Sequence, residues 1–318
     1  MRHKTSAMVE AGILAAVAIV FALISMYVPV IGMFVNFLWS LPISICGARN
    51  GMRWSIMTLL VAGAIIAMLI SPIHSLSLVA VFGTLGVVLG ECMKRHFPPM
   101  KLMLFGSVAA FISLMLSLAI GFFIMGINPL EMFFATFDKA IVDSVAYYQS
   151  QGMTPAQIED ATKSAKDMLR MVQVIMPGAF ILCAPIITFV NYLAARAILS
   201  KLGEYFESFP RFVNLEVPKW VLLPYGASLL VITQYISQPT HILYLVGVNI
   251  QMLCSFVLVI QGIALVYWYM EQKHKPKWWG TVVVGIIFLN QFVSQVIVLV
   301  GAFDLVFDFR KVRTRPPE

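Results

Sequence analysis

The side chains that could carry chemistry in this chain are mostly amides and histidines set inside apolar stretches. Asn36 and Trp39 are three residues apart, which places them on one face of a helix, and His74 sits in a Pro-x-His turn. A polar and an aromatic side chain on one face can orient a small ligand in an apolar cavity. We therefore predict Asn36, Trp39 and His74 as ligand-binding residues. In the alternative, Asn36 bonds a neighbouring helix and Trp39 belongs to an interfacial aromatic belt.

Further amides lie within later apolar stretches. Such residues often mark binding or transport sites in membranes, but most of them bond one helix to another. No acidic residue occupies the middle of a confident apolar stretch, so a carboxylate proton relay has little support. We expect the two Pro-x-His histidines, His74 and His241, to be turn residues rather than a metal pair. The amides are Asn191, Asn249, Gln251, Gln261, Asn290, Gln291 and Gln295.

Common catalytic signatures are missing from the sequence. It contains no His-Glu-x-x-His, no Gly-x-Ser-x-Gly, no Walker-type phosphate loop and no paired aspartates inside apolar stretches. We expect no enzyme activity, no catalytic residue, no metal and no cofactor. The cysteines, spaced for neither a metal site nor an external disulfide framework, are Cys46, Cys92, Cys183 and Cys254.

Membrane helices must position these side chains. The chain has 318 residues, 60% of them hydrophobic and 12% charged, and its mean hydropathy is +0.88. A soluble domain is about 25% charged, so a water-soluble fold cannot hide this apolar surface. The long unbroken runs suit helical spans and exclude the alternating strands of a β-barrel. The net charge of +7 comes from loop lysines and arginines and gives no case for nucleic-acid binding.

Nine apolar segments predict an all-α, polytopic transmembrane bundle with eight or nine membrane segments. A cytoplasmic N-terminus keeps most loop lysines and arginines inside, and the turns around Pro29, Pro72 and Pro239 carry none. One more crossing by the last segment would export the basic tail. That segment is either a re-entrant hairpin or a helix with a polar stripe, and we expect the C-terminus inside. The segments are 8–30, 33–48, 54–72, 75–93, 102–126, 171–197, 219–237, 241–270 and 279–303.

One long polar region interrupts this pattern at 127–170. It is predicted to be an external, amphipathic helical insertion, and Thr154-Pro155-Ala156-Gln157 reads as a capped helix start. The mixed-charge, proline-containing stretch that follows the sixth segment predicts a domain boundary. We expect a transmembrane unit at 1–200, which includes the insertion, and a C-terminal transmembrane unit with a basic tail at 201–318.

Two segments carry small residues at helical spacing. In lipid, such a face lets another helix approach closely, and that helix belongs either to this chain or to a partner membrane subunit. The first face is Ala11, Ala15, Ala18 and Ala22, and the second contains Gly83, Gly86 and Gly90.

The N-terminal part resembles the S components of energy-coupling-factor transporters. The resemblance rests on the basic N-terminus, the alanine-faced first helix, the external proline turn, the short second helix and the ending Phe82-Gly83-Thr84-Leu85-Gly86-Val87-Val88-Leu89-Gly90. It covers 1–200 and implies a membrane unit of six helices that binds a solute and depends on a partner for energy.

The C-terminal part contains Asn249, Gln261-Gly262 and the ending Gly301-Ala302-Phe303-Asp304-Leu305-Val306-Phe307-Asp308-Phe309-Arg310-Lys311. With these residues it resembles the YybS-like family of predicted bacterial membrane proteins. That family has no settled activity. Its motif here is Asp304, Asp308, Arg310 and Lys311. We expect the ending to be an anchor in which Arg310, Lys311, Arg313 and Arg315 meet anionic headgroups; the alternative is a docking site for a cytoplasmic partner.

The expected function is that of a transporter-type small-solute-binding subunit without its own nucleotide site. The alternative is a membrane scaffold or regulatory protein that recruits partners through helix faces and its basic tail. Rod-shape membrane proteins, whose hydropathy also resembles S components, are an example. The expected partners are the lipid bilayer, another membrane subunit and, for the first function, a small solute. The expected location is the bacterial cytoplasmic membrane.

Overall fold

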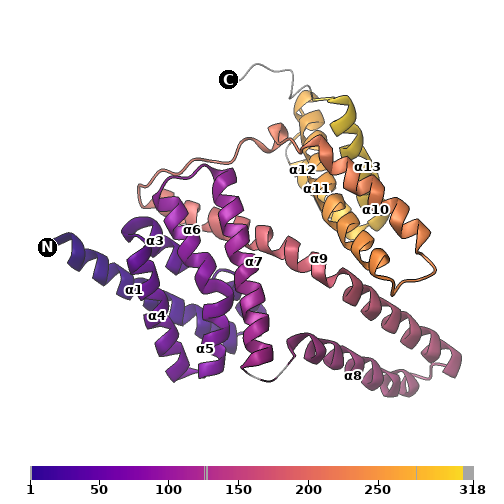
Figure 1. The fold of residues 1–318 in the computed structure, drawn as a ribbon, viewed down its shortest axis with the longest axis horizontal. Helices are drawn as coiled ribbons and strands as arrows, with labels where there is room; N and C mark the ends of the chain where they lie inside the picture. Colours follow the sequence, from indigo (N-terminus) through magenta and orange to yellow (C-terminus); the bar gives the residue numbers. More distant parts are fainter. Residues whose placement is uncertain (1, 125, 127, 277, 311–318) are drawn as a thin grey trace. The chain divides into compact units, whose positions relative to one another are not determined.

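The structure of the chain is a computed structural model that describes residues 2–124, 126, 128–276 and 278–310. These residues form helices joined by turns, with no strand in the described part (Figure 1). The all-α fold expected from the apolar segments is confirmed. The chain divides into two compact units: Met1–Leu169 with Phe180–Ser208, called unit 1, and Arg170–Ala179 with Phe209–Glu318, called unit 2.

Unit 1 contains the first eight helices and most of the ninth. Several begin with proline in the first turn, where its fixed φ suits a helix and its missing N–H costs no hydrogen bond. The turn at 38–40 divides the predicted second segment into two helices. The elements are α1 (Arg2–Tyr27), α2 (Pro29–Phe37), α3 (Leu41–Asn50), α4 (Met52–Leu69), α5 (Pro72–Leu78), the π-helical turn η1 (Val79–Gly83), α6 (Thr84–Lys94), α7 (Pro99–Phe123), α8 (Pro129–Ser150) and α9 (Pro155–Lys201).

The alanine face of α1 lies inside unit 1. Ala11, Ala15, Ala18 and Ala22 are each at most 6% exposed, and α1 packs along α2 and α4. Three of these alanines belong to an apolar cluster that also contains Trp39 and side chains from α4, α5, η1 and α6. Of the two alternatives for this face, packing within the chain is the one that the structure contains.

Helices α3 and α6 touch through their backbones. A Cβ added at Gly90 would lie 2.7 Å from the Ser44 carbonyl oxygen and 2.8 Å from the Cα of Gly47. Added at Gly86 or Gly83, it would meet side chains of α3 or α4 at 2.8 to 2.9 Å. The glycine face predicted from the sequence therefore also packs inside unit 1.

The predicted insertion forms α8 and the start of α9. The Thr154 hydroxyl accepts the Gln157 N–H, and the Gln157 side chain accepts the Thr154 N–H, so the predicted capping box is confirmed. Helix α9 then continues to Lys201 over 47 residues. That length corresponds to about 70 Å at 1.5 Å per residue. The second half of the insertion and the sixth apolar segment are thus one helix.

Unit 2 is built around α11, which packs on α10 and α13. Glycines bring α11 and α13 close together, since a Cβ added at Gly301 would lie 2.9 Å from the Gly262 nitrogen. The elements are the short 3₁₀ turns η2 (Phe212–Asn214) and η3 (Lys219–Val221), α10 (Leu222–Gln234), α11 (Ile242–Gln272), α12 (Trp278–Leu289) and α13 (Gln291–Phe307).

Asn290 breaks the ninth predicted segment. The helix pair Trp278–Ile287 and Gln291–Phe307 is bent by 113° at this point. The Asn290 side chain accepts the N–H groups of Phe292 and Val293, which caps α13. With 12 residues, α12 is about 18 Å long, shorter than the roughly 30 Å core of a bilayer. The bend contradicts a continuous helix that carries a polar stripe, and the pair is either a broken span or a re-entrant hairpin.

Seven helical stretches in the described part of the chain are long and apolar enough to cross a membrane, and α12 with α13 makes an eighth if the bent pair is one span. The α2–α3 pair counts as one stretch, Val30–Asn50. The predicted segment 219–237 is not among them because α10 has only 13 residues. The polytopic helical bundle expected from the sequence is confirmed.

Candidate functional site

Trp39 lies at the centre of unit 1. Its side chain is 0% exposed, and its indole N–H donates to the carbonyl oxygen of Ala18 in α1 over 3.0 Å. Apolar side chains from several helices surround it. Trp39 is therefore a core residue with a satisfied N–H group, and the aromatic-belt alternative does not describe it.

Asn36 and His74 each hold one buried polar atom with no hydrogen-bond partner among the described residues: Asn36 Oδ1 and His74 Nε2. Asn36 lies in the last turn of α2, three residues before Trp39. His74 lies in the first turn of α5, where its backbone N–H donates to the hydroxyl oxygen of Ser71 over 3.1 Å. Four residues later, Leu78 joins the cluster that contains Trp39. Along the chain, Asn36 and His74 are thus three and four residues from members of that cluster.

Asn191 in α9 bonds the break between α2 and α3. Its Nδ2 donates to the carbonyl oxygen of Phe37 over 2.9 Å, and its Oδ1 accepts the Ser40 hydroxyl over 2.6 Å. Residues near a helix break lack intrahelical partners, and lipid supplies none. Asn191 is 0% exposed and makes the interhelical bond expected of an intramembrane amide.

Asn249 in α11 enters the backbone ladder of α9. Its Nδ2 donates to the Val174 carbonyl oxygen over 2.7 Å, and its Oδ1 accepts the Gly178 N–H over 2.6 Å. In an uninterrupted α-helix those two backbone groups would bond each other. These two groups lie beside Pro177, which has no N–H to donate. The Asn249 side chain therefore supplies polar partners at a weakened point of α9.

A buried ion pair occupies the end of α13 in unit 2. The Arg310 Nε donates to Asp304 Oδ2 over 2.9 Å, and both side chains are at most 2% exposed. The two terminal nitrogens of Arg310 donate to the carbonyl oxygens of Val213 and Leu215 over 2.6 and 2.9 Å. Asp304 Oδ1 is buried and has no partner in the described part of the chain.

Gln261 connects this ion pair to α11. Its Nε2 donates to Asp304 Oδ2 over 2.6 Å, and its Oε1 accepts the Val217 N–H over 3.1 Å. Gln261 is 1% exposed. A charged pair and an amide on α11 and α13 are therefore joined to the segment that precedes α10.

The headgroup role expected of Arg310 is wrong, because its guanidinium is buried against Asp304 and two carbonyl oxygens. Asp308 ends α13 in the left-handed conformation, with φ of 48°, and the chain changes direction there. Lys311, Arg313 and Arg315, assigned to headgroups with it, lie outside the described residues.

The sequence interpretation missed the buried acid. It ended the last segment at residue 303 and treated Asp304 as part of an anchor, whereas α13 continues to Phe307 and buries Asp304 at 3% exposure. The available signal was an acidic residue in an apolar helix with an arginine six residues later. Buried charges in apolar surroundings require such a partner.

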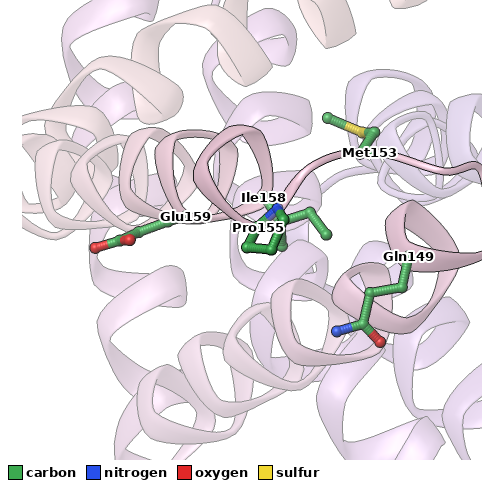
Figure 2. A pocket seen from close by; sticks show the side chains of 5 residues that line it. All are labelled: Gln149, Met153, Pro155, Ile158 and Glu159. Carbon is green, nitrogen blue, oxygen red and sulfur yellow. The ribbon is translucent and has the colours of Figure 1, made fainter.

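A shallow hollow lies where α8 ends and α9 begins (Figure 2). It measures 330 Å³, and its lining does not include Asn36, Trp39 or His74. The residues around it are Gln149, Met153, Pro155, Ile158 and Glu159.

A known protein resembles the chain over nearly its full length. The "Uncharacterized protein YybS" of Bacillus subtilis (strain 168) is 24% identical over 311 residues, which are 96% of this chain and 98% of that protein. No solved structure matches the chain. The family described as "Predicted membrane protein (DUF2232)" matches residues 16–305. The chain therefore belongs to the DUF2232 family of membrane proteins, as the YybS-like resemblance of its C-terminal part indicated.

Proposed function

We propose that this integral membrane protein is a transporter-type subunit that binds a small solute in unit 1, between Asn36 of α2 and His74 of α5. The observation that carries the proposal is the pair of buried polar atoms, Asn36 Oδ1 and His74 Nε2, that lack partners among the described residues. Each such atom costs about 1–3 kcal/mol when it is left unsatisfied. A ligand that bonds both atoms would offset that cost.

Trp39 supports this site as part of its fixed apolar surroundings. It is fully buried, and its N–H is already bonded to Ala18, so it offers a solute no hydrogen bond. Asn191, bonded to Phe37 and Ser40 on either side of the α2–α3 turn, fixes the backbone beside Asn36. Surroundings of fixed shape are what a preorganised site needs.

The chemistry of the two atoms suggests the class of solute. Asn36 Oδ1 is an acceptor, and a neutral imidazole nitrogen either accepts or donates. The described residues of the Trp39 cluster are apolar. We therefore expect a small, largely apolar solute with at least one N–H or O–H group. The resemblance of the N-terminal part to S components supports the same class of function.

With the cytoplasmic N-terminus that loop charge predicts, the proposed site would lie in the outer half of the membrane. The chain carries no recognised nucleotide-binding motif, so the proposal includes a partner subunit as the source of energy. Capture of solute from outside is the role that fits such a subunit.

The test compares three substitutions in the full-length protein: Asn36→Leu, His74→Phe and Asn191→Leu. Native mass spectrometry reports any retained small molecule, and thermal unfolding in detergent reports stability. We expect the first two variants to lose the solute while the stability of the solute-free protein stays equal or rises, because an unsatisfied atom has been removed. Asn191→Leu is the matched control, and its stability should fall because bonded groups lose their partner.

Two results would contradict the proposal. One is a solute that both Asn36→Leu and His74→Phe retain at the level of the parent protein. The other is a loss of stability in Asn36→Leu as large as that in Asn191→Leu. That result would mean that the Asn36 side chain makes an interhelical hydrogen bond, as the other amides do.

The scaffold alternative draws less support from the residues named for it. The alanine and glycine faces pack against other helices of unit 1, and Arg310 is buried in its ion pair with Asp304 in unit 2. Protein partners that co-purify in the absence of any solute would favour it.

A further inference from the structure

The segment at 209–218, called the strap here, is held to unit 2 by two kinds of contact. It follows the last residue of unit 1 and leads into η3 and α10. Val213 and Val217 are buried, whereas Asn214 and Glu216 between them are exposed. Val217 and Leu215 pack on the apolar cluster of α11 and α13 that contains Leu258 and Leu305. The strap therefore has an inward apolar side and an outward polar side.

Three buried polar bonds hold the strap through its backbone. The Arg310 guanidinium donates to the carbonyl oxygens of Val213 and Leu215, and the Gln261 side chain accepts the Val217 N–H. The planar fork of arginine suits two acceptors at once in a way that a lysine ammonium does not. Because Arg310 and Gln261 both bond Asp304 Oδ2, the three backbone bonds of the strap depend on one carboxylate.

The network is incompletely satisfied. Asp304 Oδ1 is buried with no partner among the residues described, although Oδ2 receives two donors. A half-satisfied buried network stabilises a fold less than a complete one. Next to the strap, a hollow of 410 Å³ is lined by Glu216, Val217, Pro218 and Lys219, so its outer side is not packed solid.

We propose that the Asp304–Arg310 pair is a latch that holds the strap against α11 and α13, and that the strap opens as one piece when the pair separates. When the pair separates, the carbonyl oxygens of Val213 and Leu215 lose their donor Arg310 together. The Gln261 amide then loses the carboxylate that orients it. The strap then keeps its apolar contacts and the exposed Arg211–Glu271 pair but has lost these buried polar bonds. Asp308, which lies between the two charged residues, is in the left-handed conformation.

Hydrogen exchange on the unmodified, full-length protein in nanodiscs tests the proposal without a mutation. The amides of 213–217 should lose protection together and at lower cost than those of the neighbouring part of α11. Exchange of these amides one by one, or only together with α11, would overturn the latch.

Limited trypsin digestion tests the role of the pair directly, because Arg211 and Lys219 flank the latched part of the strap and are exposed. In Arg310→Gln we expect cleavage at these two sites to rise at least about tenfold, because a broken buried pair leaves a charge unpaired. Cleavage at Lys163 and Lys166 in α9 should stay unchanged. Uniform acceleration at all sites would mean global destabilisation and would overturn the proposal.

The matched control is Glu271→Gln. It removes the exposed ion pair between Glu271 and Arg211 of the same strap, whose side chains are 39% and 73% exposed. Exposed pairs contribute little to stability, so cleavage should change less than about twofold. An effect equal to that of Arg310→Gln would show that any lost strap contact suffices and that the buried pair has no special role.

Chemical rescue covers the case in which Arg310 variants fold poorly. Arg310→Ala is purified with ethylguanidinium, which can occupy the vacated place, or with ethylurea, which has a similar shape and no charge. We expect ethylguanidinium alone to restore protection of the strap, and to fail in the double variant Arg310→Ala/Asp304→Asn. Equal rescue by ethylurea, or rescue without Asp304, would overturn the latch.

Discussion

At the residue scale, buried polar atoms in this protein fall into two groups that have opposite consequences when they are mutated. Trp39, Asn191 and Asn249 have partners on other helices, and those bonds join segments far apart in the sequence. Asn36 and His74 hold atoms without partners in the described chain. Lipid offers no replacement bonds, so the first group stabilises the fold whereas the second costs stability until something binds.

The first group can be tested at Trp39. We expect Trp39→Ala to lower the free energy of unfolding by about 3–5 kcal/mol, because a large buried side chain leaves a cavity and the Ala18 carbonyl loses a donor. Trp220→Ala is the control, since Trp220 is 65% exposed, and it should change that free energy by less than about 0.5 kcal/mol. The measurement is reversible unfolding in mixed detergent micelles. Similar changes in the free energy of unfolding for the two variants would mean that Trp39 is not a core residue.

The spacing of Asn36 and Trp39 predicted a common helical face, which is wrong because α2 ends at Phe37 and Trp39 lies in the turn at 38–40. Periodicity gives the direction of a side chain on its own helix, and the partner depends on which helix packs there. Trp39 lies beside Ala18 only because the alanines of α1 allow a close approach. For the same reason, the sequence could suggest that Asp304 and Arg310 form a motif and could not show that Arg310 would bond the strap.

At the scale of helices, close packing in unit 1 depends on faces without large side chains. The face of α1 that contains Ala15 and Ala18 is at most 2% exposed at those residues and packs beside α4 and Trp39. The neighbouring Ala16, about 100° further round the helix, is exposed. One helix thus supplies a test site and its control one residue apart.

We expect Ala15→Leu to destabilise unit 1 by about 1–3 kcal/mol, because the larger side chain forces α1 away from its neighbours. Ala16→Leu adds the same atoms on the exposed face and should leave stability within about 0.5 kcal/mol of the parent. Thermal unfolding in detergent compares the two. The packing argument fails if Ala15→Leu is as stable as Ala16→Leu.

The apolar segments and the capping box were predictable at this scale, and the continuity of α9 was not. Pro177 and Pro185 fall within α9, and proline ordinarily ends or kinks a helix because it removes a backbone donor. Asn249, more than 70 residues away, bonds the Val174 carbonyl oxygen and the Gly178 N–H on either side of Pro177. The sequence analysis divided this helix at 170, where the chain changes from polar to apolar, because a change of polarity does not show where a helix ends.

At the scale of the whole molecule, the distribution of charge predicts the orientation in the membrane. Lys94 and Arg95 follow directly on an apolar helix, and Lys273 and Lys275 follow α11. The positive-inside rule assigns these positions to the cytoplasm, which puts 132–168 on the other side. The proposed solute site depends on this orientation, because it determines the side from which a solute enters.

We expect a maleimide that cannot cross membranes to label Ser150→Cys in intact cells and to label Lys94→Cys only after the membrane is opened. Both positions are exposed in the structure. A single Cys183→Ser background suffices, because Cys183 is exposed and the other three cysteines are buried. Labelling of Ser150→Cys only in opened membranes would reverse the orientation and move the solute site to the inner half.

The bond between Asn191 and Ser40 also constrains the order in which the protein is made. The two residues are 151 positions apart. A bacterial ribosome adds roughly 5–20 residues per second, so Ser40 waits about 8–30 seconds before Asn191 is synthesised. During that time the turn between α2 and α3 is already in or near the membrane without its amide partner. The nascent first segments must therefore remain loosely assembled, or be held by the insertion machinery, until the second half of α9 arrives.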